Sequence, residues 1–586
     1  MRPRSTETRP VRPGDWRLLV RLWGVARPYR SALLGGVGLM GVGAVGRMAG
    51  PYLIKVAIDG PVVRGDARGL ALLATLYLAV QVGVGGLEAA QILLLRTRGE
   101  RILRDLRTRL FAKALALPMD RLDHTPAGTV VSRVSSDVAV LADLFSAGMV
   151  GVLGDVILVL GILTVLVRLH AGLALTVVAV FPALLVVSEG VRRGMREAYR
   201  AAREHTARLT AAVHEHLRGA EVVRLFGARA WSLEQVRDHG EANLRAQVRS
   251  VTLQALFFPL VELFSAVTLA LVLWRGAGFA AGGGLTFGAL VAFFEYVQRL
   301  FRPLRDVGER INVLQSSLAA VERIVGFLDE PAERRRGRGR PTIRGGIRFD
   351  GVRFGYGDGP DVLAGFDLEI TPGESLALVG ATGAGKTTVV HLLLGFYCPR
   401  VGRILVDGVP LDEIDPTWMS RHLALVPQEP VLLRGTVLEN IRLGREWVDE
   451  DRAVAAARAV GLHPMVETLP KGYETVLGEE GAGLSSGQRQ LVAFARALAG
   501  EPRILILDEA TSEVDQDTEA RIEEALAVLL QGRTSLVVAH RLTTVRRVHR
   551  IAVLHRGRLV EQGAHADLLE QGGLYRSLYE LNLLRS

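Results

Sequence analysis

Six long apolar runs dominate the first half of the chain. They lie near residues 31–55, 69–95, 141–168, 171–191, 250–274 and 284–306. A helix that crosses a membrane needs about 20 mostly apolar residues, and each run has that length. Several runs hold one ionisable residue, so six buried helices of a soluble protein are the alternative. The stretches 69–87, 171–188 and 276–294 contain no charged residue, however, and this favours six membrane-spanning helices.

The pattern changes after residue 346. Short apolar segments there alternate with Gly-rich turns and polar helices, which is typical of a soluble α/β domain. Between the two halves, the segment LDEPAERRRGRGRPTIRGG is too rich in Pro, Gly and Arg to bury a core. We therefore predict a membrane domain over 1–325, a linker over 326–345 and a soluble domain over 346–586.

Composition supports this division. A length of 586 residues suggests several domains, and a mean hydropathy of +0.26 with 23% charged residues argues against a disordered or purely soluble chain. The single cysteine, Cys398, excludes an intrachain disulfide and a cysteine-based zinc or iron–sulfur site. We expect Cys398 to be a small core residue.

The basic residues predict the orientation in the membrane. The chain has a net charge of +10, and Arg is concentrated in the first 30 residues and in the stretches 96–113 and 192–249. By the positive-inside rule, the N-terminus, the segments 96–140 and 192–249 and the C-terminal half are cytoplasmic, which predicts a multi-pass protein of the cell (inner) membrane. Membrane topology explains the arginines, so we expect membrane lipids and no nucleic acid as partners.

A short apolar strand, ESLALVG, leads into the sequence GATGAGKTTVVHLLLG, which runs from a Gly-rich loop into a helix. The spacing Gly380-x-x-x-x-Gly385-Lys386-Thr387 is that of a P-loop. Glycines let backbone N–H groups surround phosphates, and the N-terminus of the following helix favours negative charge. Lys386 is then expected to neutralise the β- and γ-phosphates and the Thr387 hydroxyl to ligate Mg²⁺. Lys386 is also one of only four lysines in the chain.

A second strand, ILILDE, ends in two carboxylates. Asp508, at the end of the strand, is suited to bind Mg²⁺ directly or through water. Glu509 is placed to act as the general base for an attacking water.

Taken with their surroundings, these residues resemble the ATP-binding cassette (ABC) family. The stretch Gly481–Gln490 resembles the family's signature and immediately precedes a helix. Gln428 in LVPQEPVLL matches the Q-loop, Ser512–Asp515 the D-loop, and His540 in VVAHRLTTV the switch histidine. Tyr356 in VRFGYGDG matches the aromatic residue that stacks on adenine.

The resemblance implies an α-helical membrane domain with six transmembrane helices, followed by an α/β P-loop nucleotide-binding domain with a helical subdomain. It implies ATP and Mg²⁺ as cofactors and a set of site residues. Those expected to bind ATP are Tyr356, Gly380, Thr382, Gly383, Ala384, Gly385, Lys386, Thr387, Thr388 and Gln428. Those expected to contact the ATP of a second chain are Ser485, Ser486, Gly487, Gln488 and Asp515. Mg²⁺ is assigned to Thr387, Gln428 and Asp508, and catalysis to Glu509, His540, Gln428 and Lys386.

The whole chain resembles a half-size ABC exporter of the bacterial multidrug type, and SRVSSDV (132–138) and AAVERIVGFLDEP (319–331) are similar to exporter segments. The resemblance implies an ATPase coupled to transport, a translocase, in which a dimer moves hydrophobic or amphipathic small molecules outward by alternating access. A lipid flippase, or an ATP-gated channel or regulator on the same scaffold, is the alternative. Breaks in the cytoplasmic helical stretches, near 117–128 and 217–230, would be the coupling helices.

One position departs from the family pattern. The usual signature is Leu-Ser-Gly-Gly-Gln, and here Ser486 replaces the first glycine. Glu509 is present, so the chain's own site resembles a competent one. In heterodimeric members, a chain with this glutamate often faces a partner without it, and an altered signature completes the weaker site. This favours a second, different half-transporter as the partner over a homodimer, in which the serine is simply tolerated.

Charged residues within apolar runs are expensive to bury in a membrane and are candidates for function. Arg47, Asp155, Glu262 and Glu295 lie well inside the predicted spans. We predict a substrate cavity that accepts cationic amphipathic compounds, with Glu262 and Glu295 as the main contacts. The alternative is that these charges pair with one another or with helix ends.

Overall fold

The computed structural model describes residues 27–143, 149–331, 337–508, 516–539 and 545–583. The chain divides into two compact units. The first unit comprises 1–115 and 128–330, and the second comprises 116–127 and 331–586. A short segment from the helical half of the sequence, 116–127, therefore belongs to the second unit.

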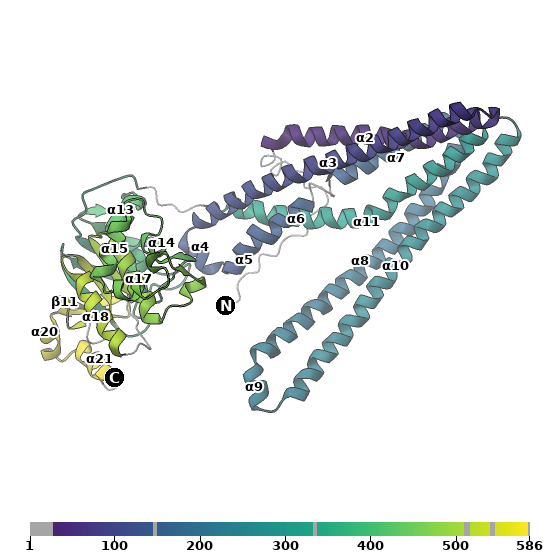
Figure 1. Ribbon diagram of the computed structural model, residues 1–586. Helices are drawn as coiled ribbons and strands as arrows, with labels where there is room; N and C mark the ends of the chain where they lie inside the picture. Colours follow the sequence, from purple (N-terminus) through teal and green to yellow (C-terminus); the bar gives the residue numbers. More distant parts are fainter. Residues whose placement is uncertain (1–26, 144–148, 332–336, 509–515, 540–544, 584–586) are drawn as a thin grey trace. The chain divides into compact units, whose positions relative to one another are not determined.

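The first unit is helical (Figure 1). Its long helices are α2 (Arg30–Ala57), α3 (Ala67–Leu115), α7 (Met149–Leu169), α8 (Ala171–Arg218), α10 (Arg229–Ala281) and α11 (Phe287–Asp329). Its short helices are α5 (Ala127–Ser132), α6 (Val138–Asp143) and α9 (Ala220–Leu225). Helices α8 and α10 form a long antiparallel pair joined through α9, whereas α2 packs against α3, α7 and α11.

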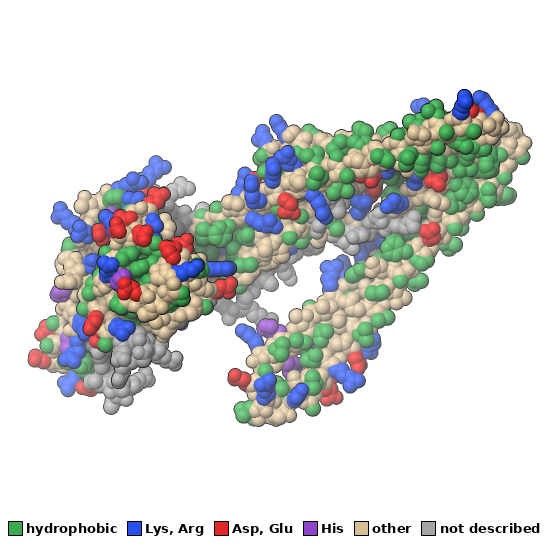
Figure 2. All heavy atoms as spheres, in the orientation of Figure 1, with side chains coloured by type: hydrophobic (Ala, Val, Ile, Leu, Met, Phe, Trp, Pro, Cys, Tyr) green, Lys and Arg blue, Asp and Glu red, His purple; other side chains and the backbone are tan. Residues whose placement is uncertain are grey.

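Five helices among the described residues are long and apolar enough to cross a membrane. They are Arg27–Val62, Ala67–Leu115, Gly151–Leu169, Ala171–Arg218 and Arg229–Ala281. The sixth predicted span lies in α11, where Glu295, Arg299 and Arg302 interrupt the apolar sequence. Hydrophobic side chains spread over the outer faces of these helices, and charged side chains gather toward the α9 end of the α8–α10 pair (Figure 2). Lipid is the solvent that suits such outward-facing apolar side chains.

The interior of the first unit is formed where α7, α8, α10 and α11 meet. Phe293, Tyr296 and Phe301 of α11 are fully buried there, with Val272 of α10. The hydroxyl of Tyr296 donates a hydrogen bond of 2.5 Å to the main-chain oxygen of Met48, which attaches α11 to α2.

The two exporter-like segments, 132–138 and 319–331, lie side by side. A π-helical turn over Arg133–Asp137 directs Asp137 toward Arg323 of α11, and the closest of their hydrogen bonds is 2.6 Å long. The guanidinium of Arg133 lies 4.8 Å from the ring centroid of Phe327. The end of α11 is thus attached to the helical segment that leads into the third predicted span.

The second unit contains two main sheets. The antiparallel sheet has the order β2 (Leu363–Ile370), β1 (Ile347–Phe354), β4 (Val401–Val406), β5 (Val409–Pro410). The larger sheet has the order β12 (Arg558–Gly563), β11 (Arg550–His555), β3 (Ser375–Val379), β10 (Thr534–Val538), β9 (Ile504–Asp508), β6 (Leu423–Val426). All neighbours in it are parallel except the β11–β12 pair. Strands β3, β9 and β10 are almost wholly buried, as expected for parallel strands covered on both faces.

Helices cover the sheets and form a helical subdomain, as predicted. Packed near the strands are α12 (Lys386–Leu393), α13 (Pro416–His422), α18 (Gln516–Leu530), α20 (His565–Glu570) and α21 (Leu574–Leu583). The subdomain contains α14 (Val437–Arg442), α15 (Glu450–Ala459), α16 (His463–Glu467) and α17 (Ser486–Ala499), with the small β7–β8 pair (Gly435–Thr436 and Val476–Leu477). One more helix of this unit, α4 (Met119–His124), comes from the segment 116–127, far ahead of the others in the sequence.

The prediction for Cys398 is wrong. Its side chain is exposed, because the residue lies in the turn between α12 and β4 rather than in either element. Small size and low polarity favour burial, but the turn places Cys398 in the lining of a surface depression, beside Tyr397 and Pro399.

Candidate functional site

The strand order of the larger sheet brings the predicted nucleotide residues to one edge. Strands β3, β10, β9 and β6 are parallel neighbours, so their carboxyl ends meet there. The P-loop follows β3, Asp508 is the last residue of β9, and Gln428 lies two residues after β6. The register pairs Val538 with Asp508 and Val426 with Leu507, which places these ends level with one another.

The glycines of the P-loop are required by its backbone. Gly383 and Gly385 have φ values of +80° and +106°, a region that strains other residues. At Gly380, a side chain would overlap the main-chain oxygen of Leu554. Gly385 occupies the N-cap of α12, so the free N–H groups of that helix open onto the loop. Such a nest of N–H groups at a helix N-terminus binds phosphate.

Lys386 is the first residue of α12, and its side chain is buried over the loop. Its ammonium donates hydrogen bonds to the main-chain oxygens of Gly380 and Ala381, 2.7 and 3.2 Å away. Burial lowers the pKa of Lys386, while the negative charge of Asp508 opposes this shift. Lys386 is therefore a buried cation bonded to carbonyl dipoles beside the N–H groups of the loop, an arrangement that suits a polyphosphate.

The predicted Mg²⁺ ligands fit that ion chemically. Thr387 and Gln428 are exposed beside the loop, and Asp508 adds one carboxylate at the same edge. Among the described residues, no group of three or more His, Cys, Asp or Glu could form an all-protein metal site. Mg²⁺ commonly takes one or two carboxylates and completes its shell with water and substrate phosphates, and this donor set leaves room for both.

Tyr356, predicted to stack on adenine, lies in the turn after β1 and is partly exposed. Its hydroxyl lies 3.1 Å from the hydroxyl of Thr388 in α12, so the ring is attached to the P-loop helix. Two other rings, Phe354 and Tyr397, pack against it nearly at right angles, at centroid distances of 5.0 and 5.1 Å.

A polar clamp that the sequence did not reveal fixes this turn. Arg400 donates to the main-chain oxygens of Gly357 and Gly359 at 2.6 and 3.0 Å, and to Asp361 at 2.9 Å. Arg353 binds the other oxygen of Asp361, and these bonds lower the pKa of its carboxyl. Arg400 lies 39 positions from Asp361 and the pair follows no motif, so only the tertiary fold identifies the clamp.

The signature residues lie at the start of α17. Ser485 is its N-cap: its hydroxyl accepts the N–H of Gln488 at 3.2 Å, and the Gln488 side chain accepts the N–H of Ser485 at 2.9 Å. Ser486 is the first helical residue and is exposed, whereas Gly487 is buried. Ser486 has no positive φ, so serine is accommodated here without backbone strain.

Three predicted site residues lie outside the described residues. They are Glu509, Asp515 and His540, and Ser512 of the D-loop match lies outside as well. Asp508 and Ala539, the described residues next to Glu509 and His540, both lie at the carboxyl edge of the sheet.

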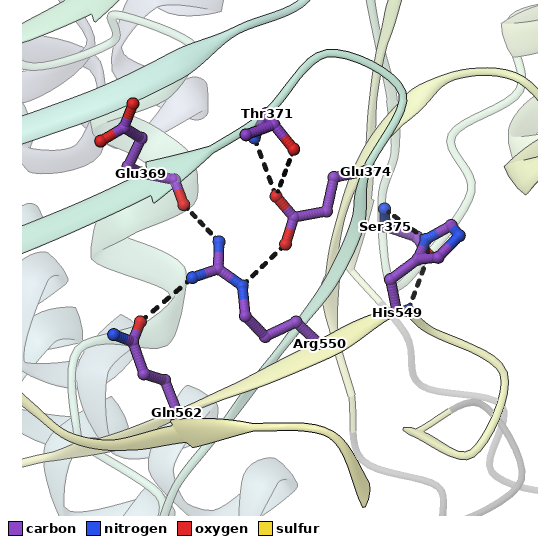
Figure 3. Close-up of polar contacts among 7 residues, drawn as sticks. All are labelled: Glu369, Thr371, Glu374, Ser375, His549, Arg550 and Gln562. Atoms are coloured by element: carbon purple, nitrogen blue, oxygen red, sulfur yellow. Dashed lines mark hydrogen bonds and ion pairs between the residues drawn. The ribbon is translucent and has the colours of Figure 1, made fainter.

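A different polar cluster fixes the amino end of β3 (Figure 3). Arg550 of β11 donates to Glu374 at 2.7 Å, to Gln562 at 3.2 Å and to the main-chain oxygen of Glu369. Burial raises the pKa of Glu374, but its bonds to Arg550 and Thr371 outweigh burial, and the net pKa is lowered. This cluster supports the strand that carries the P-loop from the end opposite to the nucleotide site.

Arg47, Asp155 and Glu295, three of the charges within the predicted spans, form ion pairs inside the first unit. Arg47 forms an ion pair with Glu88, and its main-chain oxygen accepts from Arg299 at 2.6 Å. Arg299 also lies 3.6 Å from Glu295. Asp155 pairs with Arg310 of α11 at 2.8 Å, and Glu262 is exposed on α10.

Comparison with known proteins assigns both units. The family model for the ABC transporter transmembrane region matches residues 34–304, and the ABC transporter model matches 363–512. The ATP-dependent lipid A-core flippase of Thiobacillus denitrificans is 37% identical over 97% of this chain and 99% of that protein. The chain belongs to the ABC exporter family.

Two further relatives are informative about this exporter. The probable multidrug resistance ABC transporter YheH of Bacillus subtilis is 33% identical over 88% of this chain and 77% of its own length. The structure of a bacterial Atm1-family ABC exporter with ATP bound has a TM-score of 0.77 and 28% identity, covering 94% of this chain and 98% of that one. The chain is thus a half-size exporter, a membrane protein with an ATPase that drives transport, and exporters of this type dimerise.

Proposed function

We propose that this exporter lies in the cell (inner) membrane with its N-terminus and nucleotide-binding unit in the cytoplasm, and moves hydrophobic or amphipathic small molecules outward. One observation carries the proposal. A P-loop with a buried Lys386, Asp508 and Gln428 at one sheet edge belongs to the same chain as long helices that expose apolar faces.

Each nucleotide residue has a chemical task in the proposed reaction. Lys386 and the P-loop N–H groups bind the β- and γ-phosphates, and the ring of Tyr356 stacks on adenine. Thr387, Asp508 and Gln428 would hold Mg²⁺, which neutralises charge on the phosphates when bound. Glu509 accepts the proton of the attacking water, while Gln428 and His540 position that water beside the γ-phosphate.

We propose that the partner is a second half-transporter whose signature closes over this P-loop. Ser485 and Ser486 are exposed at the capped N-terminus of α17, an end that favours negative charge, and this supports a contact with the phosphates of the opposite site. Ser486 causes no backbone strain, so its effect comes from the added side chain, which would weaken the site that this signature completes. A weaker second site favours a different chain as the partner. The purified chain expressed alone should be largely inactive as an ATPase; a robustly active homodimer would refute the heterodimer.

The second break, at α9, exposes a row of apolar side chains that suits a docking function. Leu217, Val222, Leu225 and Phe226 are each more than half exposed. In the second unit, Val431 and Leu433 are similarly exposed just after Gln428. We propose that α9 of one chain docks on this region of the partner's nucleotide-binding unit and transmits its closure to the spans.

We propose cationic amphipathic compounds as substrates, with Glu262 and Glu295 as contacts. Relatives are named both as a lipid flippase and as a multidrug transporter, so lipid remains the second candidate. Efflux of a cationic dye should fall in Glu262→Gln and Glu295→Gln without loss of ATPase. Unchanged efflux would exclude the contact, translocation of labelled lipid would support the flippase, and ATP-gated ion conductance would identify a channel.

A further inference from the structure

A short helix from the membrane half of the sequence packs beside the adenine end of the nucleotide site. Leu117 is buried and Met119 of α4 packs against the core that contains β1, β2 and α12. The same segment, 116–127, belongs to the second unit. This is the first of the two predicted coupling helices.

Tyr397 connects this helix to the adenine-stacking ring. Its hydroxyl donates a hydrogen bond to the carboxylate of Asp123 in α4. Its ring meets Tyr356 nearly at a right angle, 88°, with 5.1 Å between the centroids. The hydroxyl of Tyr356 in turn contacts Thr388 of α12. Four residues from three distant parts of the sequence therefore form a continuous path from α4 to the P-loop helix.

The surroundings hold Tyr397 in this arrangement. His391 stacks on its ring at a centroid distance of 5.9 Å, and Phe354 meets its ring at 5.5 Å. Burial and the charge-assisted bond to Asp123 raise the pKa of Tyr397, so its hydroxyl keeps the proton that it donates. The backbone of the Tyr356 turn is fixed by Arg400. Of the rings that contact Tyr356, Tyr397 is the one that is also bonded to α4.

We propose that Tyr397 is a positioning residue through which α4 responds to the adenine base of bound nucleotide. Stacking of a base on Tyr356 restricts the motion of that ring and, through it, the motion of the Tyr397 ring. The hydrogen bond from Tyr397 to Asp123 of α4 is thereby strengthened. The inference rests on the proposed adenine contact of Tyr356. This response of α4 differs from closure of two nucleotide-binding units around the γ-phosphate, because it requires the adenine base and does not require a second chain.

Hydrogen exchange of the full-length protein in lipid nanodiscs tests this directly. Backbone exchange of 116–127 is measured without ligand and with ADP, ATP or inorganic tripolyphosphate. ADP and ATP should both slow exchange about fivefold, a change of the size that one typical hydrogen bond contributes, and tripolyphosphate should slow it less than about twofold.

Substitutions separate the relay from general stabilisation. Tyr397→Phe keeps the ring but removes the hydroxyl, and should abolish the slowing of 116–127. Asp123→Ala should have the same effect, and the double variant should match either single one. Tyr473→Phe is the matched control, because it removes a hydroxyl bound to His463 in the helical subdomain and should leave the slowing intact.

Exchange of the P-loop, 380–388, is measured in the same samples. If ATP fails to protect the P-loop, the proposed nucleotide site is wrong and the relay falls with it. If the P-loop is protected but tripolyphosphate protects 116–127 as well as ATP does, the relay alone is wrong. Wild-type protection of 116–127 in Tyr397→Phe would also overturn it.

Discussion

The two polar regions of this exporter balance their charges in opposite ways. In the first unit, Arg47 pairs with Glu88 and Arg310 with Asp155. At the P-loop, the buried ammonium of Lys386 is bonded to main-chain oxygens. Charges that are neutralised by each other mainly hold helices together, whereas a cation that donates its hydrogen bonds to main-chain oxygens favours an incoming anion. The comparison shows why intramembrane charge alone is a weaker indicator of a binding site than the P-loop lysine.

Removing the P-loop cation should have the largest effect. Lys386→Ala should lower ATP hydrolysis by about 100-fold or more, because a preorganised charge on the transferred phosphoryl group is lost. Lys471→Ala is the matched control, since Lys471 is an exposed lysine of the same unit. Steady-state phosphate release in vesicles of the native membrane, where the proposed partner chain is present, measures both, and equal activity in the two variants would break the comparison.

Breaking a membrane pair should lower stability. Asp155→Leu leaves Arg310 without this carboxylate and should cost about 1–3 kcal/mol of unfolding free energy, discounted for partial exposure. Asp155→Leu with Arg310→Leu should recover most of that loss. Thermal unfolding in detergent measures stability, and dye efflux is recorded in parallel. If the double variant is as stable as wild type but has lost efflux, the pair contributes to substrate binding rather than to the stability of the first unit.

The cluster behind β3 should give a smaller, pH-dependent effect. Glu374→Gln should destabilise the protein by about 1 kcal/mol at neutral pH, because a charge-assisted bond to Arg550 becomes a neutral one. The folded-state pKa of Glu374 is lowered, so this stabilisation is present above the ordinary value of 4.5 and is lost as pH falls through the folded-state pKa. Denaturant unfolding of wild type and variant at neutral and acidic pH measures the difference; a constant difference would contradict the assignment.

The smallest effect concerns protons. Burial lowers the pKa of Lys386 in the free protein, and bound phosphates would raise it. At alkaline pH, between the lowered pKa and the ordinary lysine value of 10.5, ATP binding should therefore be accompanied by uptake of a fraction of a proton. ATP affinity should also fall as pH rises through the lowered pKa. Calorimetry in buffers of different ionisation enthalpy detects this uptake. Tyr356→Ala should retain it and Lys386→Ala should lose it.

Contiguous motifs made much of the fold and site predictable. The P-loop and the strand that ends at Asp508 each lie within about 20 residues, so their local patterns determine their structure. Contacts between distant segments were not predictable. Tyr397 and Asp123 are 274 positions apart, and the Arg400 clamp follows no spacing rule. Exposure of Cys398 likewise depends on where a turn lies in the tertiary structure, which residue type does not determine.

ATP-dependent transport in inside-out vesicles of the native membrane tests the central claim most directly. Vesicles containing the wild-type chain should accumulate a cationic dye or labelled lipid only when ATP is added, and vesicles containing Lys386→Ala should not. This result would show that the charge held at the P-loop drives transport through the first unit. Equal ATP-dependent accumulation with the Lys386→Ala chain would contradict the account.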